Sequence, residues 1–317
     1  MAYKGRLAAI ILLLCCTPAR TLSVQQNPGA DESVIKLNTL WVNLNISATD
    51  PQGKKITELR REDFAIFENG VRQEIVHFAP VEAPVNLVVL LDLSGSIDSK
   101  LKALKKAASR FVDMLKENDR MAIATFTGRF RLVSDFTGDR KRLKECIDHI
   151  KDAGGDTALY DAEWKTFDLL RQIREGRKAI VMLTDGVDSS FSPKDDGGST
   201  HTFNELLMRA LEEDTTIYPI YLDTEQEWIH HYSRAAYVEA REQLRTLAVQ
   251  TGGAYFMARR IEDLDGVYQL VAEELHALYS LAYAAKDTHR DGRWRAIKLT
   301  VNREGIKLNS RRGYFAR

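Results

Sequence analysis

The spacing of apolar residues changes twice along the chain. Between residues 34 and 80, apolar positions such as Leu40, Val42 and Leu44 alternate with polar or mixed ones, and an Asn69-Gly70 pair separates two apolar runs. Alternation with a period of two predicts half-buried strands, and Asn-Gly is a preferred pair in two-residue hairpin turns. This part of the chain is therefore predicted to be β-structure.

Residues 81–279 instead alternate between continuous apolar runs and amphipathic segments. Apolar runs cover residues 87–91 and 179–183, and such runs predict strands that are buried on both faces, as in a parallel sheet. Between them lie segments such as residues 101–115, whose apolar residues recur every three or four positions and predict helices. We therefore expect an α/β fold with a doubly wound, mostly parallel sheet.

The tail, residues 280–317, returns to alternating apolar positions and predicts three or four further strands. These strands, and three from the amino-terminal part, are each too few for a free-standing sheet with a core. We expect residues 34–80 and 280–317 to pair in one small β-sandwich built from both chain ends. The α/β domain, residues 81–279, is then inserted between the two parts of the sandwich.

The first 19 residues have the composition of a targeting segment. Lys4 and Arg6 precede an apolar stretch of about ten residues, and Ala19 is a small residue suited to cleavage. This stretch is shorter than the about 20 residues that span a bilayer. We expect a secretory signal peptide over residues 1–19, a linker over residues 20–33, no membrane span, and a periplasmic or extracellular location. A lipoprotein acylated at Cys15 or Cys16 is less favoured, because neither residue follows the usual small side chain.

Composition excludes one class of partner. The chain has 45 lysine and arginine residues and 45 aspartate and glutamate residues, so it lacks the basic field that drives nucleic-acid binding. Removal of the signal peptide would leave Cys146 as the only cysteine, so no internal disulfide is expected. Cys146 lies on a predicted amphipathic helix, and we expect it to be a buried structural thiol.

Oxygen-bearing side chains follow the first apolar run at alternate positions. Asp92, Ser94 and Ser96 come directly after it, where open α/β sheets bind their ligands. Such a motif offers only oxygen atoms, which hard cations such as Mg²⁺ prefer as ligands. The chain is therefore predicted to be a metal-dependent binding module.

Two later segments extend this motif. Thr157 stands in a Gly-Gly-x-Thr-Ala turn, and Asp185 in Leu-Thr-Asp-Gly at the end of the second run. The three segments, in this order, resemble the von Willebrand factor type A domain. This resemblance implies that five side chains form a metal-ion-dependent adhesion site: Asp92, Ser94, Ser96, Thr157 and Asp185. It further implies Mg²⁺, with Mn²⁺ or Ca²⁺ as alternatives, and a protein partner that presents an exposed Asp or Glu.

The flanking segments resemble a narrower group. Residues 59–70, residues 247–253 and the terminal Arg312-Gly313-Tyr314-Phe315 are similar to secreted bacterial proteins of the VWFA-related Acidobacterial domain family. The resemblance covers essentially the whole mature chain. It implies an architecture rather than a biochemical activity.

Nearby polar residues have other interpretations. We expect Asp98, Asp156 and Asp188 to cap helices or to accept hydrogen bonds, rather than to bind the metal. The polar loop from Asp188 to residue 202 is either a partner-binding segment or a surface excursion without a role. His230-His231 lacks a third ligand at the spacing of helical zinc sites, so zinc is not expected.

Two other classes of function compete with metal-dependent binding. An enzyme is not expected, because no nucleophile-elbow, P-loop or dinucleotide-binding motif occurs around Ser94, and no histidine has the context of a catalytic base. The alternative that stays open is a cell-envelope scaffold whose metal site is only stabilising or vestigial.

Overall fold

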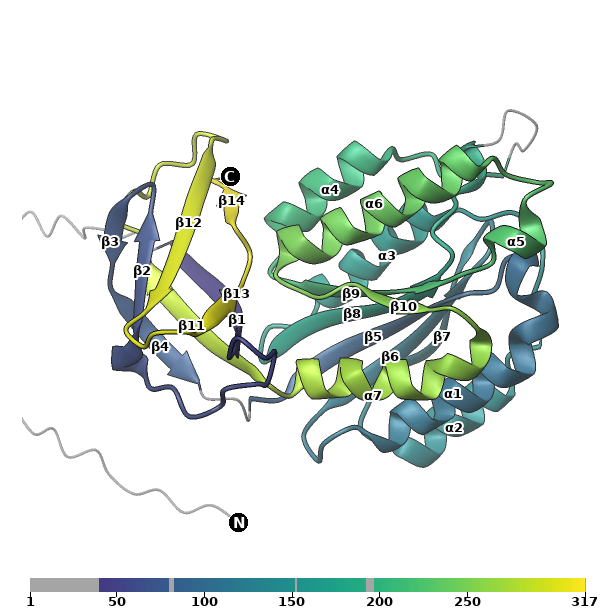
Figure 1. Ribbon diagram of the computed structural model, residues 1–317, viewed down its shortest axis with the longest axis horizontal. Helices are drawn as coiled ribbons and strands as arrows, with labels where there is room; N and C mark the ends of the chain where they lie inside the picture. The colour runs from purple at the N-terminus through teal and green to yellow at the C-terminus, as the bar shows by residue number, and fades with distance from the viewer. Residues whose placement is uncertain (1–39, 80–82, 152, 192–196, 317) are drawn as a thin grey trace, which may run out of the picture. The chain divides into compact units, whose positions relative to one another are not determined.

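The computed structural model describes residues 40–79, 83–151, 153–191 and 197–316. The predicted signal peptide and linker lie outside this part of the chain. Within it, a six-stranded sheet is covered by helices on both faces, and the strands near the two chain ends form two four-stranded antiparallel sheets (Figure 1). The predicted fold class is confirmed.

The six-stranded sheet has the order β10-β9-β8-β5-β6-β7, and its strands are parallel except for the edge strand β7. Its strands are β5 (Val85–Asp92), β6 (Arg120–Phe126), β7 (Phe130–Thr137), β8 (Arg177–Thr184), β9 (Thr216–Leu222) and β10 (Phe256–Ala258). All residues of β5 are buried, as its continuous apolar run predicts. Strands β6 and β7 lie on one side of β5, and β8 lies on its other side. The order in which the chain adds strands to the sheet therefore reverses between β5 and β8. Open α/β sheets bind ligands at the carboxyl ends of such neighbouring strands.

Three helices pack on each face of this sheet (Figure 1). One face is covered by α1 (Leu101–Asp113), α2 (Arg140–Asp148) and α7 (Leu264–Leu275). The other is covered by α3 (Leu159–Arg171), α4 (Phe203–Glu212) and α6 (Arg234–Thr251), and the short α5 (Glu225–Trp228) follows β9. In the described ranges, no helix is long and apolar enough to cross a membrane.

The strands from the chain ends form two sheets around one core, with the orders β13-β1-β11-β4 and β14-β12-β2-β3. Their bounds are β1 (Trp41–Thr49), β2 (Phe64–Glu68), β3 (Val71–Gln73), β4 (Ile75–Ala79), β11 (Leu278–Ala284), β12 (Trp294–Val301), β13 (Lys307–Asn309) and β14 (Gly313–Phe315). The amino-terminal part thus supplies four strands instead of the expected three, because β4 follows β3 after a single residue. Asn69 and Gly70 form the predicted hairpin turn with φ values of 47° and 83°.

Gly252 ends α6 in the left-handed conformation that the Gly252-Gly253 pair predicts. Its φ is 78°, and a Cβ atom at this position would lie 2.6 Å from the backbone nitrogen of Arg311. Gly292 has a φ of 71° but nothing within 4 Å of such an atom. We expect Gly292→Ala to cost roughly 1–2 kcal/mol of unfolding free energy from backbone strain alone. Gly252→Ala should cost clearly more, because the methyl group also displaces the Arg311 backbone. Urea denaturation of both variants measures the difference, and equal losses would contradict the packing argument.

Candidate functional site

The five predicted site residues lie together at the carboxyl edge of the six-stranded sheet. Asp92 is the last residue of β5, Ser94 and Ser96 follow it, and Asp185 comes directly after β8. Thr157 precedes α3 in the glycine turn. Backbone hydrogen bonds join this turn to the serine loop, from Gly154 N to the Leu93 carbonyl oxygen at 2.6 Å and from Gly95 N to the Gly155 carbonyl oxygen at 3.2 Å.

All five side chains are nearly closed to solvent, since none is more than 7% exposed. The hydroxyl oxygens of Ser94 and Ser96 lie 3.3 Å apart, and Ser94 N donates to Asp92 Oδ1 at 2.8 Å. The Ser96 hydroxyl also forms a hydrogen bond with Asp185. The structure therefore places a cluster of carboxylate and hydroxyl oxygens where the resemblance predicted one.

Two further threonines hold the carboxylates in place. Thr184 Oγ1 donates to Asp92 Oδ2 at 2.6 Å, and Thr224 Oγ1 donates to Asp185 Oδ2 at 2.7 Å. Sequence reasoning assigned a role to neither threonine. Thr184 could have been found, because it stands inside the Leu-Thr-Asp-Gly motif. Thr224 follows β9 with no motif around it, and only the pairing of β8 with β9 brings it to Asp185.

Electrostatics at the site disfavour two negative charges. Burial, and then the charge of Asp185, raise the pKa of Asp92 to about 7. Burial also raises the pKa of Asp185, although hydrogen bonds from Thr224 and Ser96 and the charge of Lys100 act in the opposite direction. Two buried carboxylates that share one site are costly to ionise together. Without a compensating positive charge, the pair therefore retains a proton at a higher pH than exposed carboxyl groups do.

Asp188 accepts hydrogen bonds, as predicted for it. Its side chain is fully buried and accepts from Leu159 N at 2.8 Å and from Ser199 Oγ at 2.6 Å. It thereby fixes the start of α3, while Ser189 Oγ accepts from Thr157 N at 2.8 Å. The side chain of Asp98 lies outside the described part of the structure, and Asp156 is exposed.

The polar loop after Asp188 is attached to α3 at its far end. Asp161 accepts from Thr200 N and His201 N, each at 3.0 Å, and the His201 ring stacks on Trp164 with 4.0 Å between centroids. The middle of the loop, residues 192–196, lies outside the described residues, so both interpretations of this loop stay open.

Helix α5 lies against the serine loop. A Cβ atom at Gly95 would lie 3.0 Å from the Trp228 ring, so a glycine allows this close approach. His231 packs on Trp228, with 4.4 Å between ring centroids. Over the described ranges, no three His, Cys, Asp or Glu side chains gather as a metal-binding group. His230-His231 accordingly has no acidic or cysteine partner there for a zinc site.

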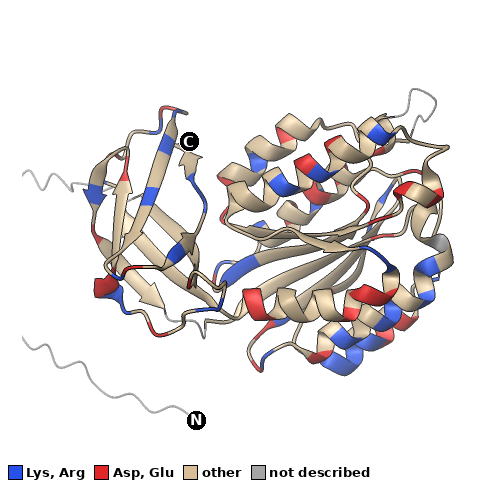
Figure 2. Cartoon of the chain, in the orientation of Figure 1, with Lys and Arg blue, Asp and Glu red and all other residues tan. Residues whose placement is uncertain are grey.

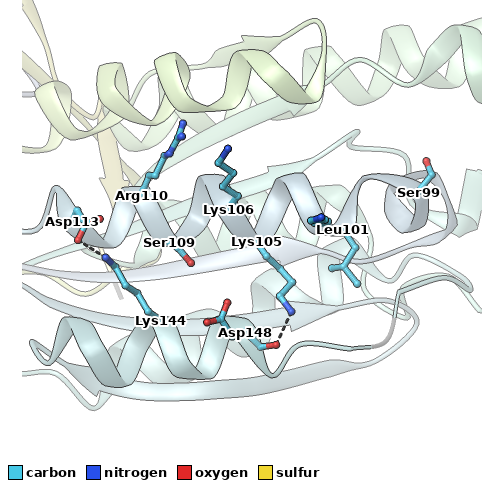
Figure 3. Close-up of a pocket in the computed structure, with 10 residues that line it drawn as sticks. Ser99, Leu101, Lys105, Lys106, Ser109, Arg110, Asp113, Lys144 and Asp148 are labelled. Atoms are coloured by element: carbon cyan, nitrogen blue, oxygen red, sulfur yellow. Dashed lines mark hydrogen bonds and ion pairs between the residues drawn. The ribbon is translucent and has the colours of Figure 1, made fainter.

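Basic residues are numerous on α1 and α2, with acidic residues among them (Figure 2). A groove of about 890 Å³ lies between these helices (Figure 3). Two of its lysines are already engaged: Lys144 donates to Asp113 Oδ1 at 2.6 Å, and Lys105 donates to the carbonyl oxygen of Asp148 at 2.6 Å. Lys105 thus stabilises the carboxyl end of α2, where helix carbonyls lack partners.

The prediction of a buried Cys146 is wrong. Cys146 is half-buried on α2 and lines a second groove, between α2 and the β6–β7 hairpin. The amphipathic pattern buries Leu143 and Ile147, and Cys146 lies beside this stripe rather than in its centre.

Comparison with known proteins finds a family match over part of the chain. Residues 87–187 match the family described as von Willebrand factor type A domain. Over these residues the chain is similar to the von Willebrand factor type A domain. The matched segment includes all five candidate site residues, from the middle of β5 to the residues after β8.

A curated relative matches a longer part of the chain at low identity. The chain is 24% identical over 212 residues to a UPF0353 protein of Nocardia farcinica, an alignment that covers 60% of this chain and 62% of the relative. The chain therefore spans less than two thirds of that relative's length.

Two solved structures contain a similar domain. A von Willebrand factor type A structure from Catenulispora acidiphila has a TM-score of 0.50 and 13% identity, covering 86% of this chain and 73% of that chain. This likeness shows the fold alone. The pilus adhesin SpaC of Lactobacillus rhamnosus GG is a further match, with a TM-score of 0.49 and 10% identity over 78% of this chain and 47% of its own. No functional conclusion follows from a likeness at that level.

Proposed function

We propose that this protein is an exported, non-enzymatic binding module that binds a protein partner through a divalent cation. The cation is Mg²⁺, with Mn²⁺ or Ca²⁺ as alternatives, and the partner presents an exposed Asp or Glu. The observation that supports the proposal is the set of five buried, oxygen-bearing side chains at the carboxyl edge of the sheet.

The chemistry of the donor set fits a hard cation. Every side-chain donor in the set is an oxygen, from Asp92, Ser94, Ser96, Thr157 and Asp185. Burial raises the pKa of Asp92 and Asp185, so their ionised forms are costly at this site. A divalent cation would offset that cost and would offer a coordination position for an incoming carboxylate oxygen.

Other residues of the chain hold the donor side chains in position. Thr184 and Thr224 orient the carboxylates, and Ser189 holds the turn that carries Thr157. Three of the five donors are neutral hydroxyls, and the resemblance implies that the two aspartates act on the cation largely through bound water. Much of the charge therefore stays uncompensated at the cation itself, so a carboxylate oxygen of a partner is a better ligand for the remaining position than a neutral or basic group. Gly155 and Asp156, beside Thr157, are exposed.

The non-enzymatic part of the proposal has its own support. Among the described residues, Ser94, Ser96 and Thr157 have no hydrogen bond to a histidine, which is the usual base that activates a hydroxyl nucleophile. Export through the signal peptide, and membership of the VWFA-related Acidobacterial domain family, rest on the sequence features given above.

Thermal unfolding of the mature chain in EDTA, Mg²⁺, Mn²⁺ and Ca²⁺ tests the proposal. A cation at 100 times its Kd adds about 2.7 kcal/mol to the free energy of unfolding. At about 2–4 °C per kcal/mol, the melting temperature should rise by several degrees. Asp185→Ala should fold and show no such rise. No rise for any ion in the folded wild-type chain would contradict the metal site and favour the scaffold alternative.

A further inference from the structure

A groove beside the candidate site shares a loop with it. This groove lies between β6, β7 and α2 and has a volume of about 740 Å³. Leu93, which stands between Asp92 and Ser94, forms part of its wall. Lys151 also lines it and begins the segment that leads to the Gly154-Gly155 turn. A ligand in this groove therefore lies next to the two loops that carry Ser94, Ser96 and Thr157, three of the five candidate site residues.

Four cationic side chains line the groove: Arg129, Arg131, Arg142 and Lys151. All four residues are exposed, and the part of the chain that the structure describes offers none of these side chains an ion pair or a hydrogen bond. The one acidic residue in the lining, Glu145, lies 3.9 Å from Lys141. Uncompensated cations grouped in this way produce a positive potential that attracts anions.

The groove between α1 and α2 differs in part. There, Lys144 contacts Asp113, and Lys105 contacts carbonyl oxygens at the end of α2, whereas Lys102 and Lys106 have no partner among the described residues (Figure 3). Two of the four lysines in that groove thus hold the protein's own elements together. In the described structure, none of the four cations beside the candidate site has such a role.

Apolar side chains make up much of the remaining wall. Phe130, Leu132, Val133 and Ile150 line the groove, and Leu132 is 40% exposed. A small inorganic anion would leave this apolar surface in contact with water. A segment with both carboxylates and an apolar side chain would pair with the arginines and cover the apolar wall at the same time.

We propose that this groove binds an acidic, partly apolar segment of the same protein partner whose carboxylate enters the candidate metal site. The statement that one partner occupies both the groove and the metal site rests on the proposed function. The positive charge of the groove is independent of the proposed function, because none of its four cationic residues belongs to the metal site. Arginine suits this role, since its planar guanidinium binds carboxylates through two parallel hydrogen bonds.

Fluorescence anisotropy with the full chain tests this proposal, with a labelled peptide of alternating aspartate and leucine residues as the probe. The groove variant combines Arg129→Gln, Arg131→Gln and Arg142→Gln. A matched control combines Arg72→Gln, Arg174→Gln and Arg312→Gln, which removes the same charge at exposed arginines outside the groove. The groove variant should bind the peptide about tenfold more weakly in both Mg²⁺ and EDTA, as the loss of three exposed ion pairs implies. The control should bind like the wild type.

The same measurement separates the groove from the metal site. Asp185→Ala and EDTA should each lower the affinity for the peptide by removing the contact with the metal. The contribution of the groove to that affinity should remain. Unchanged affinity in both, together with a loss in the groove variant, would support the groove and contradict the metal site. The groove proposal is overturned if the two triple variants lose affinity equally, or if the wild type binds no peptide in either buffer. Tighter binding of inorganic phosphate than of the peptide would also overturn it.

Discussion

Replacing Asp185 by asparagine should change the stability of the chain in opposite directions with and without Mg²⁺. In EDTA at about pH 8, the neutral amide removes one of two buried charges. The variant should then be more stable than the wild type by roughly 1 kcal/mol, which corresponds to one pKa unit of relieved repulsion. In saturating Mg²⁺ only the wild type should gain stability, so the order of the two melting temperatures reverses. Differential scanning calorimetry in both buffers measures this reversal.

The pH dependence of the Mg²⁺ effect follows from the same pair of carboxyl groups. The pKa of Asp92 is about 7 in the folded chain and 3.8 in an exposed aspartate, because burial and the Asp185 charge disfavour its ionised form. Between these values the folded chain binds more protons than the unfolded chain, so the free energy of unfolding without metal falls as the pH rises. If Mg²⁺ binds at the proposed site, it competes with those protons. The rise in melting temperature that Mg²⁺ causes should therefore be larger at about pH 8 than at about pH 5.5.

Asp119 supplies the control for Asp185→Asn. It is equally buried, at 3% exposure, but it contacts His276 Nε2 at 2.7 Å and accepts from Val85 N and Lys116 N. Burial raises the pKa of Asp119, yet these hydrogen bonds outweigh burial and hold it below its usual value. Asp119→Asn should therefore destabilise the chain in both buffers and leave the Mg²⁺ effect intact. The same order of melting temperatures for wild type and Asp185→Asn in EDTA and in Mg²⁺ would contradict the role given to Asp185.

Glu163→Gln should make the chain much more stable at alkaline pH and change little at acidic pH. Glu163 lies on the buried face of α3, and neither of its carboxylate oxygens has a hydrogen-bond partner among the described residues. Burial raises its pKa to about 8, compared with 4.5 for an exposed glutamate. The wild type therefore loses stability as the pH rises from 4.5 to 8, since the folded chain must give up a proton that the unfolded chain has already lost. At about pH 9 the difference should be on the order of 4 kcal/mol.

Urea denaturation of wild type and Glu163→Gln between about pH 5 and pH 9, in Mg²⁺, measures this effect. Glu239→Gln removes the same charge from an exposed position on α6 and should follow the wild-type curve at every pH. Parallel curves for wild type and Glu163→Gln would show that Glu163 is ionised in the folded chain at neutral pH. The argument from burial would then be wrong.

Much of this molecule is readable from residue patterns. The buried strands β5 and β8 are continuous apolar runs, and Asp92 and Asp185 mark their ends. Parallel pairing of these strands brings their ends to one edge, so two distant motifs predict one cluster. The Asn69-Gly70 turn and the Gly252 cap are equally local, because each requires a backbone conformation that few residues adopt.

Other features depend on contacts between residues that lie far apart in the sequence. Thr224 reaches Asp185 only because β9 lies beside β8. The residue spacing of α3 places Glu163 on the apolar face of the helix, whereas a carboxyl side chain usually lies at the surface. Only the packing of α3 in the folded chain shows that Glu163 is buried. Cys146 is half-exposed for the same kind of reason, since the width of the buried stripe depends on what covers α2.

The sequence by itself determined the α/β fold, the pairing of the chain ends in a sandwich, and the identity of the five candidate ligands. The fold and the pairing of the chain ends follow from periodicity and from turn chemistry, which act over a few residues. The set of five candidate ligands is instead what the resemblance of the sequence motifs to the von Willebrand factor type A domain implies. Tertiary structure alone decided which threonines hold the carboxylates, which arginines stay unpaired beside Leu93, and how far the pKa of Asp92 rises. Burial, charge pairing and hydrogen bonding between distant segments depend on three-dimensional distances, and a linear pattern does not contain those distances.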